Sequence, residues 1–131
     1  MLTHLMIPIL LLEETKMVRK GEVYYIQVDD AIGSEQSGLR PALVIQNNIG
    51  NKYSPTTIIA FITTQDKKPD MPTHVNLDDY CGLPQKSIVM LEQIRTVDKT
   101  RLRERVGRCS KFTMSKVNEA IEKSFFLTDE E

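Results

Sequence analysis

The run Thr56–Thr64 (Thr-Thr-Ile-Ile-Ala-Phe-Ile-Thr-Thr) constrains the fold more than any other part of this sequence. It is made almost entirely of β-branched and aromatic residues, which pack well on a pleated surface, and it contains neither Gly nor Pro. We therefore predict a β-strand here, and the fold must supply a sheet that receives it.

Shorter runs of similar character predict further strands at Glu22–Val28, Pro41–Gln46, Thr73–Leu77, Ser87–Ile94 and Arg105–Cys109. The segments Asp29–Leu39, Asn47–Pro55 and Gln65–Pro72 are rich in small or polar residues and are predicted as loops and turns. A chain of 131 residues has room for one domain and one modest core.

The C-terminal part of the chain has helical periodicity. Ser110 is a suitable N-cap for a helix that runs to about Leu127. Its apolar positions fall on one face, namely Met114, Val117, Ala120, Ile121 and Phe125. Several short strands and one helix predict a mainly β (α+β) fold, a small, partly open β-barrel with a C-terminal helix packed against it.

The charge of the chain is nearly balanced, with a formal net charge of -1. This argues mildly against a protein that binds nucleic acid in bulk, because phosphate contacts usually require a basic protein. One stretch, from Arg95 to Lys111, is nevertheless strongly basic. It is either a solvated face or a patch that follows a phosphate backbone.

Neither the cysteines nor the histidines form a metal-binding motif. Cys81 and Cys109 lack the CxxC spacing of a zinc or redox site, and we expect free thiols in a reducing cytoplasm. His4 and His74 lie in no HExxH or HxH arrangement. We therefore expect a cytoplasmic protein that uses neither a metal nor another cofactor.

The N-terminus contains an apolar stretch, Leu5–Leu12, which is too short to span a bilayer and lacks the flanks of a signal peptide. We expect no membrane association. Residues 1–17 are interpreted as an extension that is disordered, packs as an arm or lies upstream of a true start at Met17. The domain is expected to occupy residues 18–131.

Arg40 stands where a polar loop, Gly33–Leu39, enters a buried strand. A guanidinium is well suited to bidentate phosphate contact and to stabilising charge on a phosphorane-like transition state. Pairing with Glu35 on the surface is the alternative. Thr63 is expected at the end of its strand, beside a loop, although it is also an ordinary β-former.

Two polar pairs occupy positions where core residues are expected. Gln46–Asn47 closes one strand, and Glu92–Gln93 lies inside Leu-Glu-Gln-Ile-Arg. Amide and carboxylate groups can read base edges, and they can equally be satisfied polar groups within a sheet.

Four segments together resemble the MazF/PemK (Kid) toxin family, especially its Firmicute EndoA-like branch. The longest is Gly33–Asn47 (Gly-Ser-Glu-Gln-Ser-Gly-Leu-Arg-Pro-Ala-Leu-Val-Ile-Gln-Asn), and the others are Gly50–Thr56, Pro72–Val75 and Leu91–Lys99. The resemblance extends from about Val18 to Leu127. It implies an SH3-like barrel of the CcdB/PemK type and a homodimer with an RNA groove at its interface.

The resemblance also implies a metal-independent, sequence-specific endoribonuclease that leaves a 2′,3′-cyclic phosphate and a 5′-hydroxyl on single-stranded RNA. The family's catalytic residues fall on Arg40 and Thr63. Its RNA contacts fall on Ser34, Glu35, Gln36, Asn47, His74, Glu92 and Gln93. The partner implied is a MazE-like antitoxin, whose disordered acidic segment would compete with RNA for the groove.

A toxin of another class remains the alternative. CcdB-like proteins use the same barrel to bind and poison DNA gyrase. Such a protein has no need of an arginine directed at phosphate, so Arg40 and Thr63 favour the ribonuclease.

Overall fold

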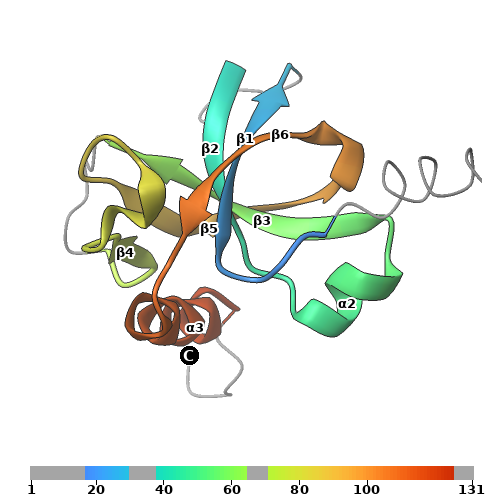
Figure 1. Ribbon diagram of the computed structural model, residues 1–131. Coiled ribbons are helices and arrows are strands. Elements are labelled where there is room, and N and C mark those ends of the chain that lie inside the picture. The colour runs from blue at the N-terminus through green and yellow to red at the C-terminus, as the bar shows by residue number, and fades with distance from the viewer. Residues whose placement is uncertain (1–16, 30–37, 65–70, 126–131) are drawn as a thin grey trace, which may run out of the picture.

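Six antiparallel strands form one sheet in the computed structural model, in the order β4-β5-β3-β2-β1-β6 (Figure 1). The structure describes residues 17–29, 38–64 and 71–125. The strands are β1 (Glu22–Val28), β2 (Gly38–Val44), β3 (Thr56–Thr63), β4 (His74–Asn76), β5 (Ile88–Asp98) and β6 (Leu102–Arg108). The helical elements are α2 (Asn48–Tyr53), α3 (Lys111–Phe125) and the 3-10 turns η1 (Tyr80–Gly82) and η2 (Lys99–Arg101).

Each face of this sheet carries its own apolar core because successive residues of a strand point to opposite faces. One core, here called the outer core, includes Leu43, Ile62 and Leu91 and is covered by Val117 and Ala120 of α3. The other, the inner core, takes residues from β1, β2, β3, β5 and β6: Tyr24, Ile26, Val28, Ala42, Val44, Ile59, Phe61, Met90, Val97 and Leu102, joined by Val18. The sheet curves around the inner core as a small, partly open barrel, as predicted.

The strand β3 lies between β2 and β5, as its apolar composition indicates, and β1 has the predicted bounds. The prediction for β5 was too short, since the strand continues past Ile94 to Asp98, where it pairs with Thr56. The residues after Ile94, Arg95–Asp98, are mostly polar and lack the composition on which the prediction rested. The other boundaries were also displaced, because β2 begins at Gly38 and β6 at Leu102.

The prediction of a turn at Asn47–Pro55 was wrong, because residues 48–53 form the short helix α2. Asn47 is its N-cap and accepts a 2.8 Å hydrogen bond from the Gly50 backbone N–H. Asn51 is buried; its amide donates to the Gln46 carbonyl at 2.9 Å and its oxygen accepts from the Thr57 hydroxyl at 2.7 Å. These tertiary contacts hold a helix whose local composition is typical of a turn.

The helix α3 begins as predicted. The Ser110 hydroxyl accepts from the Thr113 backbone N–H at 3.1 Å, which is an N-cap hydrogen bond. Met114 and Ile121 pack on the outer core with Val117, but Phe125 is 56% exposed and does not belong to the buried face. Within the described ranges, no helix is long and apolar enough to cross a bilayer.

The expectation of free thiols was wrong, because Cys81 and Cys109 form a disulfide between η1 and the end of β6. The two residues are 28 positions apart in sequence, but their Cα atoms lie 4.5 Å from each other. A close backbone contact brings them together. A Cβ built on Gly82 would lie 2.4 Å from the Val106 carbonyl oxygen, and one on Gly107 would lie 2.3 Å from the Cys81 oxygen. Only glycine fits at either position.

Candidate active site

Arg40 and Thr63 lie on the neighbouring strands β2 and β3. The strand register pairs Ala42 with Phe61, and Arg40 and Thr63 are each two residues beyond that pair in the same direction. Because side chains alternate along strands, both residues project on the side of the inner core. The pairing with β1 supports the same orientation for Arg40, since Arg40 is paired with Ile26 of the inner core.

Both side chains stand at the rim of the inner core, where they are half-buried. Partial burial restricts the motion of each residue and leaves part of it exposed. Leu39, the neighbour of Arg40, is 58% exposed. A guanidinium and a hydroxyl held on one face, near the ends of two neighbouring strands, can together bind a phosphate from two directions.

A second polar group is formed by Glu92 of β5, the strand next to that of Thr63, and by its two partners at β4. The Glu92 carboxylate accepts from the Thr73 hydroxyl through Oε1 at 2.9 Å and meets the His74 ring Nε2 at 2.9 Å through Oε2. The structure therefore brings together His74 and Glu92, two of the residues predicted to contact RNA. Thr73 was not predicted, and its position before His74 in the Pro-Thr-His-Val segment is the only sequence signal for it.

The strand β5 carries Glu92 and Gln93 on an irregularity of the sheet. Its register with β3 shifts between Ala60, paired with Ile94, and Ile62, paired with Val89. The β5 residues between these pairs therefore face Phe61 alone, as in a large bulge. Bulges change the direction of side chains, and beside this one Glu92 contacts His74 of β4.

Some of the predicted catalytic and RNA-contacting residues lie together on the inner face of the sheet. His74 is paired with Met90, which belongs to the inner core, so His74 lies on the same face as Arg40 and Thr63. Asn47 is separate from them, because it follows the far end of β2 and caps α2. Ser34, Glu35 and Gln36 lie outside the described residues.

The basic segment Arg95–Lys111 is not one continuous surface. Lys99 is 7% exposed, and its Nζ donates to the Asn51 carbonyl. Arg105 donates through Nε to Glu22 Oε2 at 2.6 Å, and this carboxylate raises the pKa of the guanidinium. Burial, followed by the charge of Glu22, raises the pKa of the Tyr24 hydroxyl to about 12. At least two charges of this segment, those of Lys99 and Arg105, therefore bind other parts of the protein.

The described residues include one cluster with metal-binding atoms in close proximity. The ligand atoms of Asp79, Cys81 and Cys109 lie within 4.8 Å of one another. The disulfide occupies both sulfurs, and the Asp79 carboxylate accepts from the Ser110 backbone N–H at 2.7 Å. In this state the cluster offers no thiolate to a metal.

Comparison with known proteins places this geometry in context. Residues 19–125 match the family described as PemK-like, MazF-like toxin of type II toxin–antitoxin system. The chain is 46% identical over 114 residues to endoribonuclease EndoA of Bacillus subtilis (strain 168), covering 86% of this chain and 98% of that protein. It is also 46% identical to endoribonuclease MazF of Staphylococcus saprophyticus, covering 85% of this chain and 93% of the relative.

Solved structures have the same fold. A mycobacterial endoribonuclease, solved in complex with its cognate antitoxin, superposes with a TM-score of 0.71 at 25% identity and covers 85% of this chain and 97% of that one. MazF from Deinococcus radiodurans gives a TM-score of 0.72 at 20% identity, covering 85% and 98% respectively.

Proposed function

This chain belongs to the PemK-like, MazF-like toxins of type II toxin–antitoxin systems, and on that premise we propose that it is an endoribonuclease inhibited by a cognate antitoxin. Its relatives at 46% identity are named endoribonucleases and align over nearly their full length. Neither is named a gyrase poison, so the CcdB-like alternative has no specific support.

The proposed reaction is cleavage of single-stranded RNA without a metal. The ribose 2′-oxygen attacks the adjacent phosphorus, the bond from phosphorus to the 5′-oxygen breaks, and the 2′-hydroxyl proton is lost while the 5′-oxygen gains one. The products are a 2′,3′-cyclic phosphate and a 5′-hydroxyl. No redox or metal chemistry is required, because the nucleophile belongs to the substrate.

Arg40 and Thr63 are proposed as the catalytic residues. The guanidinium would stabilise the charge that accumulates on the non-bridging oxygens, and the hydroxyl would orient the phosphate or the 2′-hydroxyl. Arginine keeps its proton at neutral pH and is therefore a poor general base, so we assign it charge stabilisation. The observation that carries this proposal is the position of both residues on one face, beyond the Ala42–Phe61 pair.

RNA recognition is assigned to polar groups around this pair. Thr73 fixes the Glu92 carboxylate, and Glu92 in turn contacts the His74 ring, which gives a preorganised surface for base edges. Gln93 follows on the same bulge. The remaining contacts proposed from the family resemblance are Ser34, Glu35, Gln36 and Asn47.

The proposed partners follow from the same premise. A relative with this fold was solved with its cognate antitoxin, so we propose that an antitoxin binds this chain and competes with RNA. We further propose a homodimer, because a small domain gains stability by association and the apolar Leu39 is exposed beside Arg40. We also propose a cytoplasmic location, because the proposed substrate is single-stranded RNA. Residues 1–17 are proposed as an extension to the domain at 18–131.

The test is incubation of the purified protein with a long RNA of mixed sequence in EDTA. We expect new 5′ ends at one recurring short motif, mapped by primer extension, and 3′ ends that resist phosphatase until acid opens the cyclic phosphate. Intact RNA after incubation with folded protein would refute the ribonuclease assignment. Cleavage that requires added Mg²⁺ would refute the metal-free reaction.

A further inference from the structure

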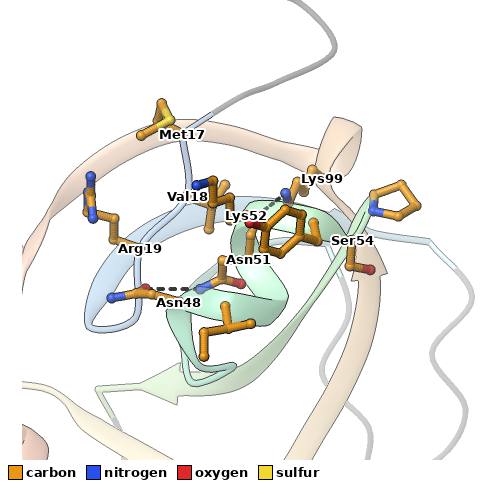
Figure 2. A pocket seen from close by; sticks show the side chains of 11 residues that line it. Met17, Val18, Arg19, Asn48, Asn51, Lys52, Ser54 and Lys99 are labelled. Atoms are coloured by element: carbon orange, nitrogen blue, oxygen red, sulfur yellow. Dashed lines mark hydrogen bonds between the residues drawn. The ribbon is translucent and has the colours of Figure 1, made fainter.

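A pocket of about 940 Å³ lies beside α2, apart from Arg40 and Thr63. Its walls are formed by the segment before β1, by the helix α2 with the turn that follows it, and by Lys99 of η2, as Figure 2 shows. Arg40 is four residues from the end of β2, or about 13 Å along the strand, and the pocket begins beyond that end. A nucleotide bound at Arg40 and Thr63 would not fill it.

All the charged residues that line this pocket are cationic, namely Arg19, Lys52 and Lys99. In a chain with a net charge of -1, three cations without a carboxylate among them are a local concentration of positive potential. Lys99 strengthens it. Its side chain is buried and donates to the Asn51 carbonyl of α2, and no carboxylate among the described residues pairs with it.

The rim of the pocket carries an exposed aromatic ring. Tyr53 is 76% exposed and Ile49, one turn earlier on α2, is 75% exposed. The Lys52 ammonium lies 5.3 Å from the centre of the Tyr53 ring. An exposed ring beside cationic side chains is the arrangement that binds single-stranded nucleic acid, with a base stacked on the ring and its phosphate near the cation.

We propose that this pocket is a second RNA subsite, which binds a phosphate and a stacked base of the substrate strand outside the segment that is cut. The inference rests on the proposed ribonuclease function and extends it. The subsite increases affinity for long RNA and does not take part in the chemical step.

The test compares two RNAs that share one cleavage motif, a short one limited to that motif and one extended on both sides. The variant is Lys52→Gln/Tyr53→Ala. Its matched control is Lys116→Gln/Phe112→Ala, which removes another exposed pair, with the Lys116 ammonium 4.5 Å from the Phe112 ring on α3. Steady-state kcat and KM are measured for wild type and both variants at several salt concentrations.

For wild type we expect a lower KM on the long RNA. In the Lys52→Gln/Tyr53→Ala variant (the α2 variant) the KM for long RNA should rise about tenfold, which is the effect of losing one stacked base. Its kcat and its KM for the short RNA should stay within about twofold of wild type. The slope of the logarithm of the binding constant against the logarithm of the salt concentration should decrease in magnitude by about one. The control should behave as wild type. Equal losses on both RNAs, or none on the long RNA, would overturn the subsite.

Two further measurements separate the remaining outcomes. If light scattering shows that the α2 variant has lost a dimer while RNA length preference is kept, the surface is a protein interface and the subsite is wrong. If wild type cuts neither RNA, the proposed function fails. Fluorescence anisotropy with the same two RNAs then still tests the subsite, through the loss of long-RNA binding in the α2 variant alone.

Discussion

Arg40 and Thr63 occupy matching positions on adjacent antiparallel strands, each two residues past the Ala42–Phe61 pair and on the inner face of the sheet. Neither belongs to a flexible tip, since each also pairs through its other neighbour, Arg40 with Ile26 and Thr63 with Ile88. A cation and a hydroxyl are thus presented on a rigid frame. Preorganised groups of this kind stabilise charge that develops in a transition state.

Thr63→Val tests the role of the hydroxyl. Valine is nearly isosteric with threonine and favours strands, so the fold should be retained. We expect kcat on a short RNA to fall about 100- to 1,000-fold, the range of a lost transition-state hydrogen bond. Thr63→Ser, which keeps the hydroxyl, should recover most of that activity, whereas equal activity in wild type and Thr63→Val would remove this residue from the mechanism.

Glu92→Gln tests the recognition surface. The change replaces the carboxylate that accepts from the Thr73 hydroxyl and contacts the His74 ring. We expect a several-fold rise in KM and a broader set of cut sites, with a smaller effect on kcat. Sequencing of the 5′ ends measures the preference. Thr73→Val, which removes one of the two contacts, should shift the cut sites in the same direction but less, and unchanged cut sites in both variants would contradict the assignment.

Reduction of the Cys81–Cys109 disulfide should destabilise the fold. The bond joins residues 28 positions apart and ties η1 to the end of β6. A loop of this size typically contributes about 2–4 kcal/mol to the free energy of unfolding. Urea unfolding with and without dithiothreitol measures the difference. A Cys81→Ala/Cys109→Ala variant is the control and should not respond to the reductant; an equal response in both proteins would argue against the disulfide.

Alkaline pH should destabilise the protein through Tyr24. Its pKa is raised from 10.0 to about 12 in the folded state, so between these values the unfolded chain loses a proton that the folded chain retains. Stability is therefore complete below pH 10 and decreases as the pH rises towards 12, by about 3 kcal/mol at most. Chemical unfolding from pH 9 to 12 measures this, and Tyr24→Phe should flatten the dependence. An identical slope in both proteins would contradict it.

The sequence was informative where local pattern decides the structure. Apolar, β-branched composition located β1 and β3, and Ser110 marked the start of α3. The pattern failed at α2, where the buried Asn51 holds a helix through tertiary hydrogen bonds. It also failed for Cys81 and Cys109, because a contact between two glycine backbones brings them together from distant segments.

The candidate site also has features that the sequence predicts and features that it does not. The loop-to-strand position of Arg40 and the strand-end position of Thr63 are visible in the sequence. Their alignment across β2 and β3 depends on register, which a sequence does not specify alone. The contact between Glu92 and Thr73 lies beside the bulge in β5, and no periodic pattern in the sequence encodes that bulge.

Single-turnover cleavage of one short RNA in EDTA by wild type, Arg40→Ala and Arg40→Lys tests the central claim most directly. The three proteins should have the same melting temperature within a few degrees, because Arg40 is only half-buried at the rim of the core. We predict a loss of at least a hundredfold for Arg40→Ala, with partial recovery in Arg40→Lys, which keeps the charge but not the planar fork. Undiminished cleavage by Arg40→Ala would contradict the assignment of catalysis to this face of the sheet.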